Sequence, residues 1–117
     1  MSRTIIQLVL LSLVCCQSAH ALSKSYEFPP EKPTEIKNPL FWTLDAHCAI
    51  ITPDSEDRMS GIMLSKNGSM NGTKVNEGGR AELTVHNGDD LHIIADRSAR
   101  IQIINHGSST VKAKCSI

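Results

Sequence analysis

The strongest constraint on this chain is an alternation of apolar and polar residues that runs from residue 40 to residue 115. Successive side chains of a β-strand point to opposite faces, so a period of two is typical of strands with one buried face. Turn-forming residues such as glycine, asparagine, aspartate and serine interrupt the alternation at short intervals. No segment has sustained helical periodicity. The pattern predicts an all-β fold, a small antiparallel β-sandwich or partly open barrel of about 6–8 short strands.

The predicted strands are short segments with alternating apolar positions. They cover residues 40–51, 60–64, 69–75, 81–85, 91–95, 99–103 and 111–115. The clearest hairpin joins 81–85 to 91–95. Val85 would pair with Leu91, and Leu83 with Ile93, across a short loop at residues 87–89 that contains Gly88.

The first 21 residues have the three parts of a signal peptide. Arg3 supplies the positive charge, residues 5–14 form an apolar segment, and Ala19-His20-Ala21 is a small-residue cleavage site. The apolar segment is shorter than the roughly 20 residues that cross a bilayer as a helix. We therefore expect cleavage after Ala21, a mature chain without a stable membrane span, and a secreted or periplasmic location.

Cleavage would remove two of the four cysteines and leave Cys48 and Cys115. Exported proteins meet an oxidising environment, and two cysteines permit a single intramolecular pairing. The bridge would close a loop of roughly seventy residues and contribute about 4 kcal/mol of stability in the chain-entropy model. We predict a disulfide between Cys48, in the first strand of the domain, and Cys115, in the last.

Residues 22–39 are expected to form an extended arm that precedes a single domain at 40–117. Four of the five prolines lie in this segment among charged residues. Proline lacks the N–H group that an interior strand donates, so the composition favours polyproline II or disorder. Tyr26 and Phe28 offer a second possibility, in which the arm docks on the domain or on a neighbouring copy.

Charge and aromatic content narrow the class of partner. The formal net charge is +0, from 12 basic and 12 acidic residues that are scattered along the chain. Without a basic patch, we expect no binding to nucleic acid or to an anionic membrane. All aromatic residues precede residue 43, so the rest of the domain offers no ring for stacking against sugars or bases. Because Phe41 and Trp42 are adjacent, one of them faces away from the other, and Trp42 is a candidate exposed anchor as well as a candidate for packing on the core or the arm.

Three polar residues could share the outward face of the predicted hairpin: His86, Asp90 and His92. Two imidazoles and a carboxylate can hold zinc or copper. Solvated polar side chains are the commoner arrangement on an exposed sheet face, so we expect no bound metal and no other cofactor. These three residues, together with Trp42, are the predicted binding surface.

Two stretches resemble known ligand-binding modules. Residues 67–76 (Asn-Gly-Ser-Met-Asn-Gly-Thr-Lys-Val-Asn) and 88–93, with His47 upstream, resemble the second half of a forkhead-associated domain, a β-sandwich that binds phosphothreonine. The chain lacks the family's Gly-Arg on an earlier strand and has Leu44 in place of the family's serine. Residues 85–95 resemble the opening of a LysM module, which binds N-acetylglucosamine polymers. That family continues with a helix, whereas this chain continues to alternate.

No catalytic residues are predicted. His47 and Cys48 are adjacent in one strand and point to opposite faces, so they cannot form a dyad. No nucleophile elbow or phosphate loop is present. We predict a small secreted or periplasmic β-sandwich, not an enzyme, that binds a protein or a component of the cell envelope or extracellular surroundings. Two alternatives stay open: an assembly subunit that associates through its arm or an edge strand, and a forkhead-associated-like or LysM-like module.

Overall fold

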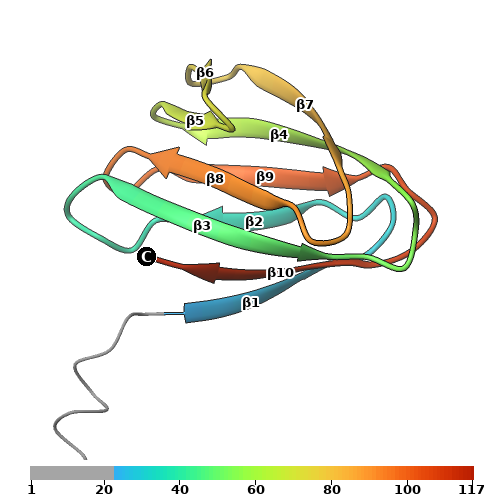
Figure 1. The fold of residues 1–117 in the computed structure, drawn as a ribbon. Helices are drawn as coiled ribbons and strands as arrows, with labels where there is room; N and C mark the ends of the chain where they lie inside the picture. Colours follow the sequence, from blue (N-terminus) through green and yellow to red (C-terminus); the bar gives the residue numbers. More distant parts are fainter. Residues whose placement is uncertain (1–22) are drawn as a thin grey trace, which may run out of the picture.

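The computed structural model describes residues 23–117, which form two antiparallel β-sheets packed face to face (Figure 1). The all-β sandwich predicted from the alternation is therefore confirmed. No helix long and apolar enough to cross a membrane occurs in residues 23–117. The predicted signal peptide, residues 1–21, lies outside the described residues.

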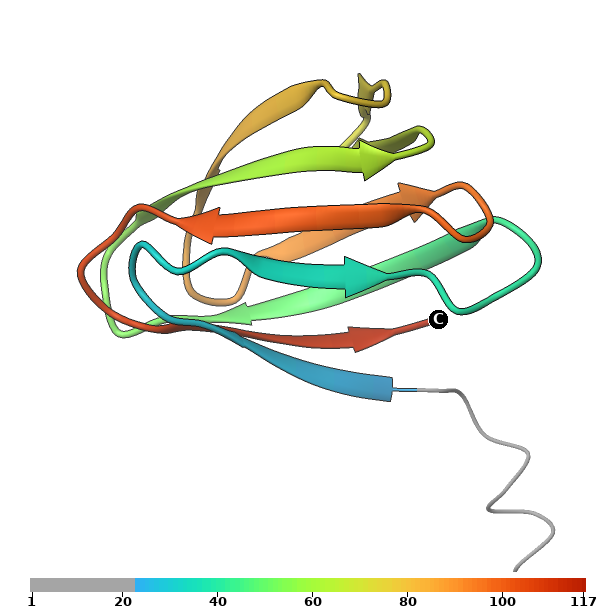
Figure 2. The same ribbon diagram turned by 180° about the vertical axis from the view of Figure 1, so that it is seen from behind.

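The two sheets differ in size, with six strands in one and four in the other (Figure 2). The larger sheet has the order β1 (Ser23–Phe28), β10 (Val111–Ser116), β3 (Leu44–Ile51), β8 (Asp90–Ala95), β5 (Gly68–Met70) and β6 (Thr73–Val75). The smaller sheet has the order β2 (Thr34–Lys37), β9 (Arg100–Asn105), β4 (Asp57–Ser65) and β7 (Arg80–Val85).

Alternation along each strand places the apolar side chains between the sheets. In β3, Ala46, Cys48 and Ile50 are buried, whereas Asp45 and His47 are exposed. Aliphatic residues and methionines fill the core. The largest fully buried apolar side chains are Ile50, Met59, Met63, Met70, Val85 and Val111. The core is thus built from the side chains that the period-two pattern assigns to the inward face.

The predicted hairpin between residues 81–85 and 91–95 is wrong. β7 pairs with β4 in the smaller sheet, and β8 pairs with β3 and β5 in the larger sheet. The loop between them crosses from one sheet to the other, and Gly88 N–H donates to the carbonyl of Ile50 at 2.8 Å. Alternation shows which face of a strand is buried but does not name its neighbour. Val85 and Leu91 are both buried, as expected, but in opposite sheets.

The proline-rich segment is extended, yet most of it belongs to the sandwich. β1 pairs with β10, and β2 pairs with β9. Both strands lie at sheet edges, where one side of the backbone needs no partner, and Pro29, Pro30 and Pro33 fall between them. Phe28 is buried in the core. Within residues 23–117, two strands therefore precede residue 40, and there are ten strands instead of about 6–8.

The disulfide between Cys48 and Cys115 is confirmed. The two cysteines lie directly opposite each other in the β3–β10 ladder, with Cα atoms 3.9 Å apart. Cys48 is buried on the inner face of the larger sheet. The bridge thus links the strand that opens the predicted domain to the last strand of the chain.

Candidate functional site

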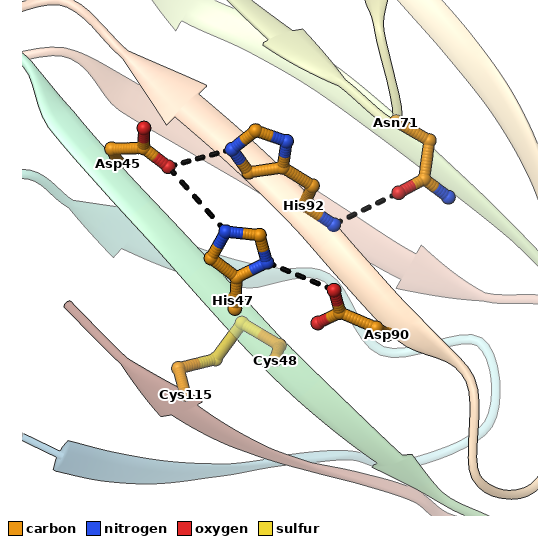
Figure 3. A network of polar contacts seen from close by, with 7 residues as sticks. All are labelled: Asp45, His47, Cys48, Asn71, Asp90, His92 and Cys115. Carbon is orange, nitrogen blue, oxygen red and sulfur yellow. Dashed lines mark hydrogen bonds and ion pairs between the residues drawn. A yellow bond between two sulfur atoms is a disulfide. The ribbon is translucent and has the colours of Figure 1, made fainter.

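Strand β3 contributes to two arrangements of side chains that could bind a ligand. Its inward residues line an apolar cavity between the sheets. Its outward residues belong to a cluster of histidines and aspartates (Figure 3). The two arrangements use opposite faces of the same strand.

The cavity is open, has a volume of about 280 Å³, and lies at the end of the sandwich that carries the C-terminus. Its wall includes Tyr26, Ile36, Leu44 and Ile101, together with the cysteines of the disulfide. Protein interiors are normally packed with few voids larger than a water molecule, so a space of this size is unusual. Small inward residues such as Ala46 help to leave it unfilled.

Exposed apolar side chains gather at the same end of the sandwich. Phe41 is 84% exposed and Trp42 is 63% exposed, both in the loop that joins β2 to β3. Ile117, at the end of the chain, is 44% exposed and lines the cavity. Of the four large apolar residues that are exposed within residues 23–117, Ile117 lines the cavity, and Phe41 and Trp42 lie in the loop whose residues Asn38 and Pro39 line it. The Trp42 side chain is therefore exposed and is not packed in the core. Its role as an anchor stays a prediction.

Asn38 fixes the loop that carries these aromatic residues. Its Nδ2 donates to the carbonyl oxygens of Trp42, Ala95 and Asp96 at 3.1, 3.4 and 3.0 Å. Its Oδ1 accepts from the N–H of Leu40 at 2.9 Å. Asn38 is 2% exposed, so the loop backbone is held by a buried amide while the Trp42 ring faces solvent.

The polar cluster lies on the outer face of the larger sheet, across β3 and β8 (Figure 3). His47 and His92 are direct cross-strand neighbours, and their rings stack with centroids 4.3 Å apart. Asp45 Oδ1 lies 2.6 Å from His92 Nε2 and 3.9 Å from His47 Nε2. Asp90 Oδ2 accepts a hydrogen bond from His47 Nδ1 at 2.9 Å. Each imidazole is thus paired with its own carboxylate.

The backbone beneath His92 is held by the turn between β5 and β6. Asn71 Oδ1 accepts the N–H of His92, and the Asn71 N–H donates to the His92 carbonyl, both at 2.8 Å. Asn71 has a positive φ of 48°, which asparagine tolerates better than most residues, and Gly72 follows it. The Asn-Gly turn signal in the sequence therefore acts as a support for β8.

His86 is separated from this cluster because β7 and β8 belong to different sheets. Its ring contacts Asp89 Oδ2 at 3.2 Å and Glu56 Oε2 at 3.6 Å. Hydrogen bonds from the backbone N–H of His86, and then from its ring, hold the pKa of Asp89 below its usual value. Of the predicted surface, His92 and Asp90 come together, whereas His86 and Trp42 lie elsewhere.

The sequence interpretation missed Asp45 and His47 as members of the cluster. Both occupy outward positions of β3, two residues apart, and this spacing is visible in the sequence. Only the pairing of β3 with β8 brings them beside His92.

A second polar arrangement, on the outer face of the smaller sheet, has the residue types of a catalytic triad. Ser60 Oγ lies 2.9 Å from His106 Nε2, and His106 Nδ1 lies 3.6 Å from Glu31 Oε1. Ser60, however, is completely buried, and the apolar cavity does not reach it. A nucleophile must contact its substrate, so this geometry supports a structural role for Ser60.

Asp57 belongs to a polar network at the end of the sandwich away from the cavity. Thr52 Oγ1 donates to Asp57 Oδ2 at 2.5 Å, and the Asp54 N–H donates to Thr52 Oγ1 at 3.2 Å. Burial raises the pKa of Asp57, while the hydrogen bond from Thr52 opposes the rise. These contacts connect the β3–β4 loop to the start of β4.

The chain matches no protein-family model, no curated protein and no solved structure. The two resemblances in the sequence correspond to turns: Asn71 and Gly72 join β5 to β6, and Gly88 lies in the crossing between the sheets. The helix expected in a LysM module is replaced by a turn and β9. The function of this protein must therefore be inferred from the residues of the cavity and of the polar cluster.

Proposed function

We propose that this protein is an exported, non-enzymatic binding protein whose cavity takes an amphiphile with a single apolar chain and an anionic head group. The observation that carries this proposal is the open apolar cavity with lysines among its lining residues and exposed aromatic side chains in a loop that contributes to its wall. Such an amphiphile is a component of cell envelopes, the class of target that the sequence interpretation favoured together with proteins.

The size and lining of the cavity favour one apolar chain. Its volume of about 280 Å³ is slightly below the roughly 300–1,000 Å³ typical of small-molecule pockets. Each methylene that moves from water to such a wall contributes about 0.8 kcal/mol. A chain that enters beside Leu44 and Ile101 would bury surface on both sheets, whereas a lipid with two chains would exceed the space.

The charges around the cavity favour an anionic head group. Lys24 and Lys37 are among its lining residues, and no aspartate or glutamate of residues 23–117 is. Lys24 Nζ lies 5.2 Å from the centre of the Tyr26 ring, within the range of a cation–π contact. The ring therefore keeps this ammonium group beside the apolar wall, where a carboxylate or phosphate could reach it.

Export is supported by the signal-like N-terminal sequence and by the disulfide, which is typical of secreted and periplasmic proteins. The alternative of assembly through a free arm has less support, because β1 and β2 already pair within the molecule. Assembly through an edge strand stays a prediction, since β1 and β2 each lie at a sheet edge.

Binding of dodecanoate, a single-chain anionic amphiphile, is expected to shift the fluorescence of Trp42, the sole tryptophan of the chain, in a saturable manner. Dodecyltrimethylammonium and dodecyl maltoside carry the same chain with a cationic or neutral head group and should bind more weakly. Lys24→Glu replaces an attraction by a repulsion, so it is expected to weaken dodecanoate binding about 10-fold. Isothermal titration calorimetry provides the dissociation constants.

Two further variants separate the roles of charge and space. Lys112→Glu makes the same charge change on the outer face of β10, paired with Ile51 far from the cavity, and should leave binding unchanged. Ala46→Phe fills the cavity from β3 and should weaken all three ligands. Equal affinity for the three head groups would disprove the charge argument, and unchanged binding to the Ala46→Phe variant would exclude the cavity as the site.

The absence of a serine-hydrolase activity is also testable. Because Ser60 is completely buried, we expect no covalent labelling by a fluorophosphonate probe under conditions that label a control serine hydrolase fully. Mass spectrometry of the intact protein measures the adduct. Labelling that disappears in Ser60→Ala would show instead that Ser60 and His106 form a working nucleophile and base.

A further inference from the structure

We propose that Asp45, His47 and His92 form a binding site for a divalent transition-metal ion of the zinc and copper class, on the outer face of the larger sheet. The three ligand atoms, one from each residue, lie within 4.8 Å of one another. This site is separate from the cavity, because outward and inward side chains of β3 face opposite ways. The inference therefore stands independently of the proposed function.

The distances suit a shared ion after small side-chain movements. Zinc binds histidine nitrogen at about 2.0–2.1 Å and carboxylate oxygen at about 2.0–2.2 Å, so two ligand atoms on one ion lie no more than roughly 4 Å apart. Asp45 Oδ1 is 3.9 Å from His47 Nε2 and 2.6 Å from His92 Nε2. The distance between Asp45 Oδ1 and His47 Nε2 is too long for a hydrogen bond, and a cation fits between these two atoms.

Asp90 prepares His47 to act as a ligand. A carboxylate only accepts hydrogen bonds, so the 2.9 Å contact places a proton on His47 Nδ1. In the neutral ring, the lone pair is then on Nε2, the nitrogen that faces Asp45 (Figure 3). A histidine whose second nitrogen donates to a carboxylate is the usual arrangement behind a metal-binding imidazole. The lone pair of His47 and the carboxylate of Asp45 would both attract a cation placed between them.

His92 needs one change before it can bind the same ion. Its Nε2 now donates to Asp45 at 2.6 Å, so the neutral ring must change tautomer: Nε2 gives up its proton to solvent and Nδ1 takes one from solvent, which frees the Nε2 lone pair for the ion. The stacked rings of His47 and His92 are nearly parallel, at 7°, so a tilt of the His92 ring out of this parallel arrangement directs its Nε2 lone pair toward the ion. Asn71 holds the His92 backbone on both its N–H and its carbonyl, so the movement is confined to the side chain.

The donor set determines the class of ion. Two imidazoles and one carboxylate suit zinc, copper and nickel, whereas magnesium and calcium prefer oxygen ligands alone. The side chains of Asp45 and His47 are more than half exposed, at 63% and 54%, and that of His92 is 35% exposed. Three protein ligands leave a position open to water or to another molecule. Copper should bind more tightly than zinc, in accordance with the general order of divalent affinities.

The test is a calorimetric titration of the purified protein, without a histidine tag, with zinc chloride and with copper chloride. We expect one ion per chain, tighter binding of copper than of zinc, and no binding of magnesium. His47→Ala and His92→Ala should each weaken zinc binding by at least about 100-fold, and Asp90→Ala should weaken it by about 10–100-fold because it releases the His47 ring. The electron paramagnetic resonance spectrum of the copper form should show two nitrogen ligands.

His86→Ala is the matched control. His86 is equally exposed, at 53%, and it also lies beside two carboxylates, those of Asp89 and Glu56. Zinc affinity in this variant should equal that of the wild-type protein, and circular dichroism should show that all variants fold. Wild-type affinity in both His47→Ala and His92→Ala, or an equal loss in His86→Ala, would overturn the proposal. Dodecanoate binding should be unchanged in every metal-site variant, so the two proposals fail separately.

Discussion

Replacement of both cysteines by alanine, Cys48→Ala with Cys115→Ala, is expected to lower the free energy of unfolding by about 4 kcal/mol. The bridge spans 67 positions of sequence, and its loss releases that segment in the unfolded chain. Small domains have a total stability of roughly 5–15 kcal/mol, so this change removes a large share of the stability. Urea unfolding followed by circular dichroism measures the difference.

The wild-type protein unfolded in the presence of a reductant is the control, because it loses the bridge without a change of side chain. The reduced wild-type protein and the double variant should have similar midpoints of unfolding. The double variant should be slightly less stable, because it also lacks the sulfur of buried Cys48. An oxidised wild-type protein with the same midpoint as the variant would contradict the prediction. The disulfide also lines the cavity, so amphiphile binding should weaken when it is removed.

The inward and outward faces of the strands could be predicted from the sequence, but the order of the strands could not. Alternation placed Val85 and Leu91 in the core correctly, since it depends on the geometry of one strand at a time. Which strand lies beside which depends on contacts between distant segments. The segment that contains Gly88 has the spacing of a hairpin loop, yet it donates to the end of β3 and crosses between the sheets.

The proline-rich segment shows a second limit of predicting strands from the sequence. Proline is excluded from interior strands, and this rule directed the sequence interpretation toward an arm. The rule does not apply at a sheet edge, where β1 and β2 lie. Tyr26 and Phe28 were the correct signal, because they alternate with polar residues and face the core side.

The polar cluster was partly predictable, because alternation gives the face of a strand but not the neighbouring strand. His92 and Asp90 stand two residues apart in one strand, which is enough to place them on one face. Their partners Asp45 and His47 required the pairing of β3 with β8. The cavity had no sequence signal, because a space between sheets arises from the packing of both, including small residues such as Ala46.

Asn105→Ala is expected to lower the free energy of unfolding by about 3 kcal/mol, because the change leaves buried backbone groups without partners. Asn105 is completely buried in β9. Its Nδ2 donates to the carbonyl oxygens of Phe28 and Ser109, each at 2.8 Å, and its Oδ1 accepts from the Gly107 N–H at 2.7 Å. One side chain thus joins the end of β1 to the β9–β10 loop.

Asn67→Ala is the matched control for Asn105→Ala, since it removes the same amide group from an exposed turn. Asn67 Oδ1 accepts a single hydrogen bond, from the Glu77 N–H at 2.8 Å. Its loss should cost less than about 1 kcal/mol, because water replaces the partner of an exposed N–H. Urea unfolding of both variants measures the contrast. Equal losses would show that the Asn105 amide does not hold β1 to the loop, and that the edge strand is retained by the β1–β10 ladder and the burial of Phe28 alone.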